Sequence, residues 1–364
     1  MKKFLIFLKW LLIIAGIIVA LTIIIAVVSY VRAPRPDPVM KTVSDSASLP
    51  GLTLNGYTFH LETFGDTANP AVIALHGGPG NDYRYLLPLK PLADSFFMVF
   101  YDQRSAGLSA RVEPESLSLD LYYQDLKAII EHFSPDRPAR LVGHSWGGML
   151  AAAFISRYPE MVSHAVLAEP GFLTLDFARE LMHKTNNFAP PMTFGTMLEM
   201  WKIGFQAMKV ETPDRFGKMD FFFEKMAFSD LPTNPMKKYY CGQTMQTSAF
   251  DSWRFGVSAM IGISGKFATA LKGGEAEVDF LDGIEDFTNE VLFIASECNT
   301  LIGANVQTRQ AELFPNARVV TIKDAGHTML GEKPQQSMRI IRDYFNQAVH
   351  ADTLTRLDSP PQRQ

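Results

Sequence analysis

The sequence predicts an α/β fold: a mostly parallel sheet with helices on both faces, an inserted helical cap, and an N-terminal transmembrane helix. Short runs of purely apolar residues recur along the chain, and such runs are typical of parallel strands that are buried on both faces. Helical patterns lie between several of these runs, which indicates a doubly wound sheet. Two segments depart from the alternation, the first thirty residues and a long region rich in Phe and Met.

The N-terminal segment is predicted to cross a membrane. Residues 10–31 carry no charge and are mostly Leu, Ile, Val and Ala, and a span needs about 20 apolar residues. A cleaved signal peptide is the alternative, but its apolar region is shorter and ends in a small-residue cleavage site, which is missing here. Three lysines precede the run and two arginines follow it. We therefore expect residues 1–31 to form an uncleaved single-pass anchor, with the main domain outside the cytoplasm.

The rest of the chain divides by composition and periodicity. Residues 32–48 are rich in Pro and Ser and are predicted to tether the domain to the membrane. We assign residues 49–170 and 287–350 to the α/β core, 171–286 to the cap, and 351–364 to a C-terminal tail. The Met and Phe residues of the cap are expected to pack together, and some of them are expected to line the substrate pocket.

Within the core, each predicted strand ends in a turn-rich segment. The strands are expected at Leu52–Phe64 (a hairpin turning at Asn55-Gly56), Ala71–Leu75, Phe96–Tyr101, Arg140–Val142, Ala165–Ala168, Val291–Ala295 and Arg318–Ile322. The helices are expected at Leu119–Phe133, Met149–Arg157, Val306–Phe314 and Gln335–Val349. In doubly wound sheets the reactive groups gather at the carboxyl ends of the strands. The polar motifs of this sequence follow those ends.

A candidate nucleophile, Ser145, follows one of these strands. It is the centre of a Gly-x-Ser-x-Gly motif at 143–147 and precedes a helix of small residues. That context is typical of the nucleophile elbow, where a strained turn between strand and helix exposes the serine hydroxyl. Flanking glycines let the two backbones pass close together.

Further motifs supply candidates for the other catalytic roles. Acyl transfer needs backbone N–H groups aimed at the developing oxyanion. We expect these from Gly78, in the His-Gly-Gly-Pro-Gly loop at 76–80, and from Trp146, directly after the serine. His327 follows the last strand, where a general base can reach the serine. Among the other histidines, His60 is expected at the surface.

Together these motifs resemble the α/β-hydrolase superfamily, and within it the proline iminopeptidase group of serine peptidases. The matching motifs, in order, are His-Gly-Gly-Pro-Gly at 76–80, Asp-Gln-Arg at 102–104 running to Gly107 and Ser109, and Gly-His-Ser-Trp-Gly-Gly at 143–148. The resemblance covers roughly residues 50–170 and 287–349. It implies a Ser-His-acid triad, no cofactor, and removal of an N-terminal residue from a short peptide.

The sequence departs from that group at two positions outside the triad. Ser105 stands where the group has Gly after Asp-Gln-Arg. In the cap, Trp253-Arg254-Phe255 lacks the glutamate that holds the free amine of the substrate in true proline iminopeptidases. A carboxylesterase or lipase activity therefore remains an alternative. Dehalogenase and epoxide hydrolase chemistry would use Asp, not Ser145, at the elbow.

The third triad member is the most informative departure. The family places its Asp a few residues after the Val291–Ala295 strand, where this chain has Asn299. An amide there cannot stabilise the imidazolium, and in serine proteases it costs about 10⁴ in rate. We expect Glu169, at the end of the strand after the nucleophile helix, to supply the carboxylate; a cap-hinge residue or a substrate-binding carboxylate is the alternative role for this residue. Glu297 is a second candidate, and the absence of any acid, leaving an idle binding module, is a third possibility.

The net charge and the spacing of the cysteines argue against nucleic-acid binding and metal binding. The chain has a net charge of −4, whereas nucleic-acid binding needs a basic face. Cys241 and Cys298 have no metal-ligand spacing, and we expect no metal. Two buried thiols are expected, with a single bridge as the alternative in an oxidising compartment. We thus predict a membrane-anchored serine hydrolase, resembling an aminopeptidase, that cleaves a small amide or ester or a short peptide without a cofactor.

Overall fold

The computed structural model describes residues 2–186, 188, 191–243, 252–273 and 278–357. Its centre is an eight-stranded sheet with the order β1-β2-β4-β3-β5-β6-β7-β8. The first two strand pairings, β1 with β2 and β2 with β4, are antiparallel, and all the others are parallel. The strands are β1 (Gly51–Leu54), β2 (Tyr57–Phe64), β3 (Ala71–Leu75), β4 (Phe97–Tyr101), β5 (Ala139–His144), β6 (Val162–Ala168), β7 (Val291–Ser296) and β8 (Ala317–Ile322).

The predicted hairpin and parallel strands are confirmed. Leu54 pairs with Tyr57 across a two-residue turn, and the turn residues Asn55 and Gly56 have φ of 49° and 75°. Positive φ at both central residues is the reason that Asn-Gly is favoured in such turns. In β3 and β4 every residue is buried, as expected for strands covered on both faces.

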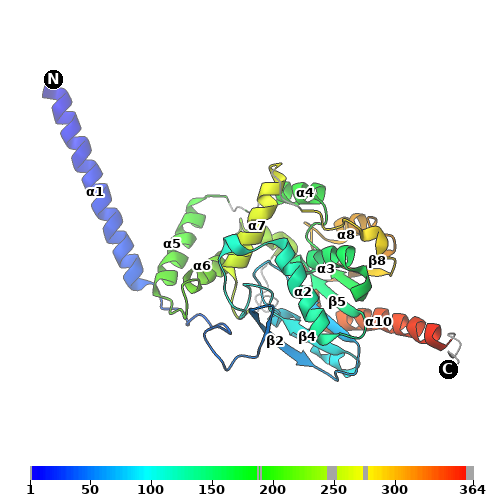
Figure 1. Cartoon of the computed structure of the whole chain (residues 1–364). Coiled ribbons are helices and arrows are strands. Elements are labelled where there is room, and N and C mark those ends of the chain that lie inside the picture. Colours follow the sequence, from blue (N-terminus) through cyan, green and yellow to red (C-terminus); the bar gives the residue numbers. More distant parts are fainter. Residues whose placement is uncertain (1, 187, 189–190, 244–251, 274–277, 358–364) are drawn as a thin grey trace.

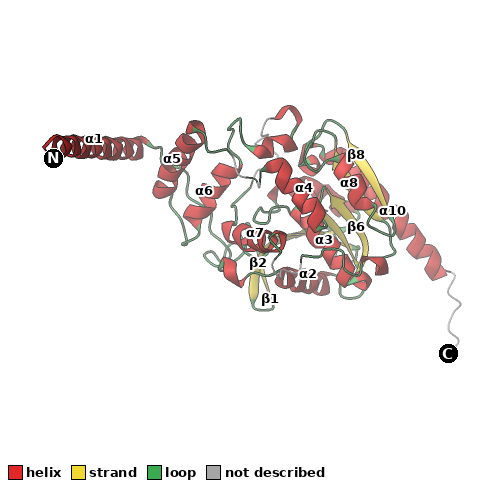
Figure 2. Ribbon diagram, turned by 90° about the horizontal axis from the view of Figure 1, so that it is seen from above, coloured by secondary structure: helices red, strands yellow, loops and turns green. Residues whose placement is uncertain are grey.

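Helices cover both faces of the sheet and enclose two apolar cores (Figure 2). On one face lie α2 (Leu119–Phe133), α3 (Trp146–Arg157) and α8 (Ala304–Ala311). On the other lie α9 (Met329–Glu332), α10 (Pro334–Leu357) and η1 (Arg84–Asp94). The sequence did not predict η1, because Pro88 and Pro91 lie inside it and proline removes a backbone donor from a helix.

The segment between β6 and β7 is helical in its described part, as its periodicity predicted. It contains α4 (Leu175–Thr185), α5 (Phe194–Lys209), α6 (Gly217–Ala227) and α7 (Val257–Leu271), with short 3₁₀ turns at Pro235–Tyr239 and Cys241–Gln243. In Figure 1, α5 and α6 lie on the side of the domain from which the N-terminal helix leaves, whereas α4 lies beside α7, towards α8.

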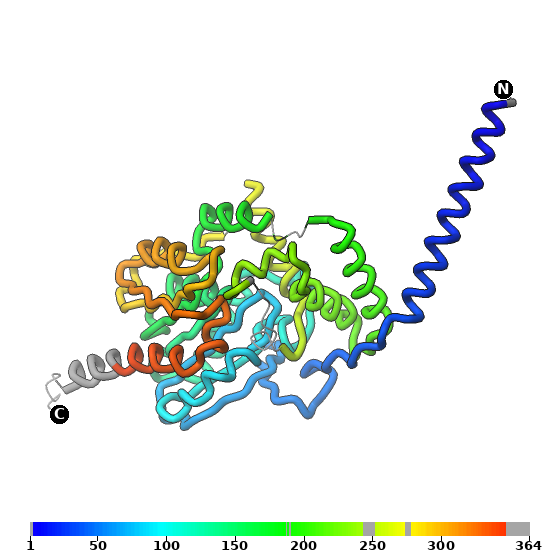
Figure 3. The backbone as a smooth tube through the Cα atoms, turned by 180° about the vertical axis from the view of Figure 1, so that it is seen from behind, coloured from blue at the N-terminus to red at the C-terminus, as the bar shows by residue number. Residues whose placement is uncertain are grey.

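The N-terminal helix α1 (Lys2–Arg32) projects away from the domain, and the two chain ends lie on opposite sides of the molecule (Figure 3). Its most apolar stretch has a mean hydropathy of 3.3, and none of that stretch is buried against the domain. By length and composition α1 can therefore cross a membrane.

The expectation of two buried thiols is wrong: Cys241 and Cys298 form a disulfide, with their Cα atoms 4.9 Å apart. The cap chain folds back over the strand ends and brings Cys241 to the loop after β7. The spacing of the two cysteines in the sequence does not predict this contact. Near this bond the N–H of Cys298 donates to Ala325 O at 3.0 Å. The bridge therefore joins the cap to the loops at the carboxyl ends of β7 and β8.

Removal of the bridge in a Cys241→Ser/Cys298→Ser variant is expected to destabilise the protein. The cysteines are 57 residues apart, and closing a loop of that length stabilises a fold by about 4 kcal/mol in the chain-entropy picture. Denaturant unfolding of the full chain in detergent measures the change, with a Leu313→Ser variant as a surface control. An unchanged free energy of unfolding would contradict a stabilising role for the bridge.

Candidate active site

Ser145 occupies a strained turn between β5 and α3. Its backbone has φ 54° and ψ −117°, which is costly for a residue with a side chain and recurs at functional sites. The flanking glycines allow this close crossing. A Cβ on Gly143 would lie 2.3 Å from Gly147 O, and a Cβ on Gly147 would lie 2.1 Å from Leu75 O. The local sequence thus forces the serine onto a sharp elbow at the carboxyl end of the sheet.

His327 lies on the loop after β8 and is held by its backbone and by its ring. Its N–H donates to Tyr239 O in the cap at 2.8 Å. Its ring packs between those of His144 and Tyr239, with centroid separations of 4.6 Å to each. The ring is therefore fixed in orientation between the core and the cap.

Glu169 and His327 are brought together by the structure. Nδ1 of His327 donates to Glu169 Oε2 at 2.7 Å, which leaves Nε2 as the ring nitrogen for a substrate-side proton. Glu169 directly follows β6, is fully buried, and has a left-handed backbone with φ 43°. The carboxylate and the serine thus follow adjacent parallel strands, each on a strained residue.

The other two candidate acid positions do not contact the imidazole. Asn299 donates from Nδ2 to Glu169 Oε2 at 2.6 Å, and its own Oδ1 accepts from the backbone N–H groups of Leu301 and Ile302. Glu297 is exposed, and its carboxylate accepts from the N–H of Asp324 at 3.0 Å. The amide at 299 therefore supports the carboxylate of Glu169.

Burial dominates the electrostatics of this pair. It lowers the pKa of His327 to about 3, so the imidazole is neutral and able to accept a proton at pH 7. Burial also raises the pKa of Glu169 to about 7, against the hydrogen bonds donated by Ser296 and Asn299, which lower it. The Ser296 hydroxyl and N–H both donate to Glu169 Oε1, at 2.6 and 2.7 Å.

The glycine loop after β3 lies directly against the serine. A Cβ on Gly77 would be 3.1 Å from Ser145 Cβ, so a side chain at this position would be crowded against the nucleophile. The N–H of Gly77 is engaged by the Tyr85 hydroxyl at 2.7 Å. The next amide in the loop, Gly78, has φ of 126°, and Trp146 begins α3 directly after the serine. These are the two residues whose N–H groups were predicted to hold the oxyanion.

A chain of hydrogen bonds connects the glycine loop at 76–80 to the loop that carries His327. The sequence did not predict this chain. Nε2 of His144 donates to the carbonyl oxygen of His327 at 2.7 Å, so its Nδ1 accepts from the Tyr85 hydroxyl, also at 2.7 Å. Burial lowers the pKa of His144 to about 3, which keeps this neutral tautomer. Tyr85 lies in η1, which carries no sequence signal of its own.

Gln103 of the Asp-Gln-Arg motif braces the same loop from the other side. Its side chain donates to His76 O at 2.8 Å and accepts from the Trp146 indole at 2.7 Å.

His60, expected at the surface, is instead buried and contacts Asp102 Oδ2 at 2.7 Å. The reason is that β2 pairs with β4 inside the sheet, and the rings of Tyr83 and Trp253 cover the face on which His60 lies.

The cap segment 253–255 presents no carboxylate. Its backbone N–H groups at Trp253 and Arg254 donate to Asp82 Oδ2, and the Arg254 guanidinium is engaged by Asp214 and Asp220. Among the described residues, no group of three or more His, Cys, Asp or Glu side chains is arranged to hold a metal ion.

Curated relatives match parts of the chain. Proline iminopeptidase of Heyndrickxia coagulans is 38% identical over 100 residues, which are 27% of this chain and 34% of that protein. Epoxide hydrolase 3 of Xenopus tropicalis is 35% identical over 114 residues, 31% of each protein. Proline iminopeptidase of Lactobacillus helveticus is 31% identical over 141 residues, 37% of this chain and 47% of that protein. The chain therefore spans less than half the length of these relatives.

Solved structures match over most of the chain. VinJ has a TM-score of 0.56 at 18% identity and covers 83% of this chain and 99% of its own. Proline iminopeptidase of Mycobacterium smegmatis has a TM-score of 0.56 at 17% identity and covers 84% of this chain and all of its own. At such identities the likeness shows the fold. The family described as alpha/beta hydrolase fold matches residues 70–334, so this chain belongs to the α/β-hydrolase fold family.

Proposed function

We propose that this protein is a membrane-anchored serine hydrolase that cleaves a small amide or ester through an acyl-enzyme. The observation that carries the proposal is the 2.7 Å hydrogen bond between His327 Nδ1 and Glu169. It pairs the proposed base with a buried carboxylate, and Ser145, Glu169 and His327 follow β5, β6 and β8 at the carboxyl edge of the sheet, although the usual acid position holds an amide. A hydrogen-bonded, buried carboxylate is what the base of such a set requires.

The reaction would proceed in two acyl-transfer steps. Ser145 Oγ attacks the substrate carbonyl while His327 Nε2 takes the hydroxyl proton. The developing oxyanion would accept hydrogen bonds from the N–H groups of Gly78 and Trp146. His327 then passes the proton to the leaving amine or alcohol, and water hydrolyses the acyl-enzyme by the same route. In the active form Glu169 is ionised and stabilises the imidazolium at each step.

An aminopeptidase activity of the proline iminopeptidase type is the first candidate for substrate class. Its support is the ordered set of motifs at 76–80, 102–104 and 143–148, together with the similarity of part of the chain to proline iminopeptidases. A carboxylesterase or lipase activity is the second candidate. It is favoured by the cap segment 253–255, which offers no carboxylate for a free amine. Turnover of an ester but of no aminoacyl amide would eliminate the peptidase version.

The membrane anchor and an extracytoplasmic domain are part of the proposal. They are supported by the length and hydropathy of α1, the lysines before it, and the disulfide between Cys241 and Cys298. Disulfides persist in oxidising compartments and are rare in the cytosol. Substrate would thus be a small molecule or short peptide met outside the cytoplasm.

A Ser145→Ala variant is expected to lose all labelling by a fluorophosphonate probe, which reacts only with an activated serine. The readout is fluorescence of the full-length protein on a denaturing gel, with wild type alongside. The far-ultraviolet circular dichroism of the variant serves as the control for folding. Correctly folded wild-type protein that takes no label would overturn the hydrolase proposal and favour an idle binding module.

A Glu169→Gln variant is expected to lower kcat by about 10⁴-fold, because the amide cannot stabilise the imidazolium. The matched control is Glu297→Gln, which changes the same side chain at an exposed position and is expected to leave kcat unchanged. Steady-state hydrolysis of a p-nitrophenyl ester measures both. A loss in Glu297→Gln with retention in Glu169→Gln would assign the acid to Glu297 instead.

The pH dependence of kcat/KM is expected to follow the ionisation of Glu169 and His327. The active form has an ionised carboxylate and a neutral imidazole, so kcat/KM falls on the acid side as the pair gains a proton. A Ser296→Ala variant removes a hydroxyl that lowers the pKa of Glu169. The pair then binds its proton more tightly, and the acid limb of the kcat/KM profile is expected to shift to higher pH. A limb that stays in place or shifts to lower pH would contradict this assignment.

A further inference from the structure

An unpartnered apolar face lies on cap helix α5. Phe194 is 77% and Leu198 is 58% exposed, and Met197, Trp201 and Met208 are exposed too. These positions recur at three, four and seven residues and so form one stripe along the helix. The opposite side of α5, with Ile203 and Ala207, packs against Phe221 of α6. Exposed apolar patches of this kind mark a binding surface.

This stripe is continuous with the end of α1. The Tyr30 ring of α1 packs edge-on against Phe205 of α5, with centroids 6.2 Å apart. At the end of α5, Lys209 Nζ donates to Ala33 O at 2.6 Å and to Val31 O at 3.1 Å. Figure 1 shows α1 leaving the domain beside α5. The helix that can cross the bilayer therefore ends against the helix that carries the stripe.

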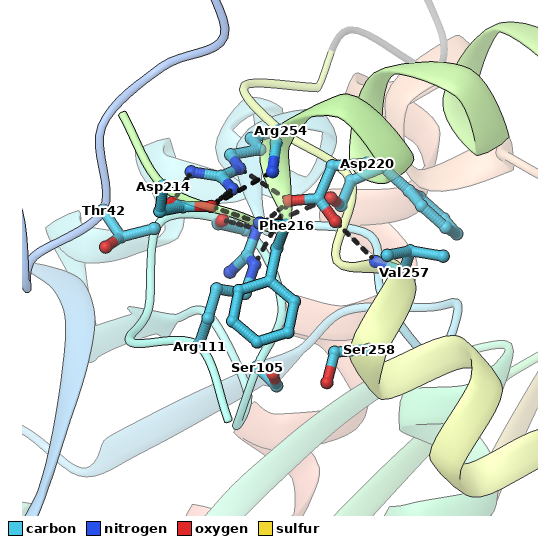
Figure 4. A network of polar contacts seen from close by, with 12 residues as sticks. Thr42, Ser105, Arg111, Asp214, Phe216, Asp220, Arg254, Val257 and Ser258 are labelled. Atoms are coloured by element: carbon cyan, nitrogen blue, oxygen red, sulfur yellow. Dashed lines mark hydrogen bonds and ion pairs between the residues drawn. The ribbon is translucent and has the colours of Figure 1, made fainter. Parts of the chain in front are cut away.

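The segment after α1 is clamped to the cap. The N–H of Val39 donates to Glu211 O at 2.9 Å, and Arg254 Nη1 donates to Met40 O at 3.0 Å. Arg254 is itself held by Asp214 and Asp220, each at 2.7 Å (Figure 4). The chain is thus held to the cap on both sides of the short Pro34–Pro38 stretch, and these contacts restrict rotation of the cap relative to α1.

We propose that the exposed face of α5 lies in the headgroup–acyl boundary of the bilayer that α1 spans. The proposal rests on the proposed membrane anchor and adds a second membrane contact, made by the cap itself. The chemistry of the face fits a lipid surface: Phe, Leu and Met point outward, and Trp201 supplies the amphipathic ring that favours the interface. Lys202, paired with Glu199 at 3.2 Å, lies among the polar positions of the same helix.

Spin-label accessibility tests the proposal on the full chain in phosphatidylcholine vesicles. Both native cysteines are bonded to each other, so a label on an introduced cysteine reports one site. Leu198→Cys is the test position, and Leu313→Cys is the matched control, because Leu313 is also an exposed leucine but lies near α8, away from α1. Phe194→Cys repeats the test one turn earlier and guards against a local effect at 198.

At Leu198→Cys and Phe194→Cys we expect a several-fold higher ratio of oxygen to nickel-chelate collisions than at Leu313→Cys, because lipid dissolves oxygen and excludes the chelate. Equal ratios at all three sites would overturn the proposal. A label at 198 shielded from both relaxants would also overturn it, in favour of a protein partner such as a second copy. A label at Ile17→Cys, in the middle of α1, distinguishes the proposed membrane anchor from the proposed contact of α5. If the label at position 17 lies in lipid and the label at position 198 lies in water, only the contact of α5 is refuted.

Discussion

The hydrogen bond from His327 to Glu169 is the interaction on which the candidate site depends. It joins loops that follow β8 and β6, so it can form only when the parallel sheet has brought their carboxyl ends together. The carboxylate is buried, and an unpaired buried charge is costly. Ser296, Asn299 and His327 all donate to it, so the sheet, the acid and the base stabilise one another.

This arrangement explains why an amide, rather than a second acid, stands at 299. Asn299 Nδ2 donates to the oxygen of Glu169 that also accepts from His327. A carboxylate at 299 would place two buried negative charges against one imidazole, and like charges this close cannot both ionise easily. An amide at 299 and a carboxylate at 169 are therefore compatible with each other. The asparagine at the usual acid position does not by itself rule out proton transfer through His327, because Glu169 contacts that histidine.

Much of this could be predicted from the sequence because the signals are local. Apolar runs indicated the parallel strands, Asn55-Gly56 the hairpin, and the flanks of Ser145 the elbow. What the sequence did not reveal depends on contacts between distant segments. The disulfide at Cys241 needs the cap to fold back over β7, and the burial of His60 needs β2 to pair inside the sheet. The hydrogen bond from Tyr85 to His144 joins residues 59 positions apart.

The cap does more than cover the strand ends, because it also contacts the backbone and the ring of His327. Tyr239 O accepts the N–H of His327, and two residues later Cys241 is bonded to Cys298, one residue before Asn299. The same cap is clamped through Arg254 to the segment that leaves α1. A movement of the cap would thus reach the histidine loop through covalent and hydrogen-bonded links. The segment after α1, the cap and the loop that carries His327 are therefore one connected unit.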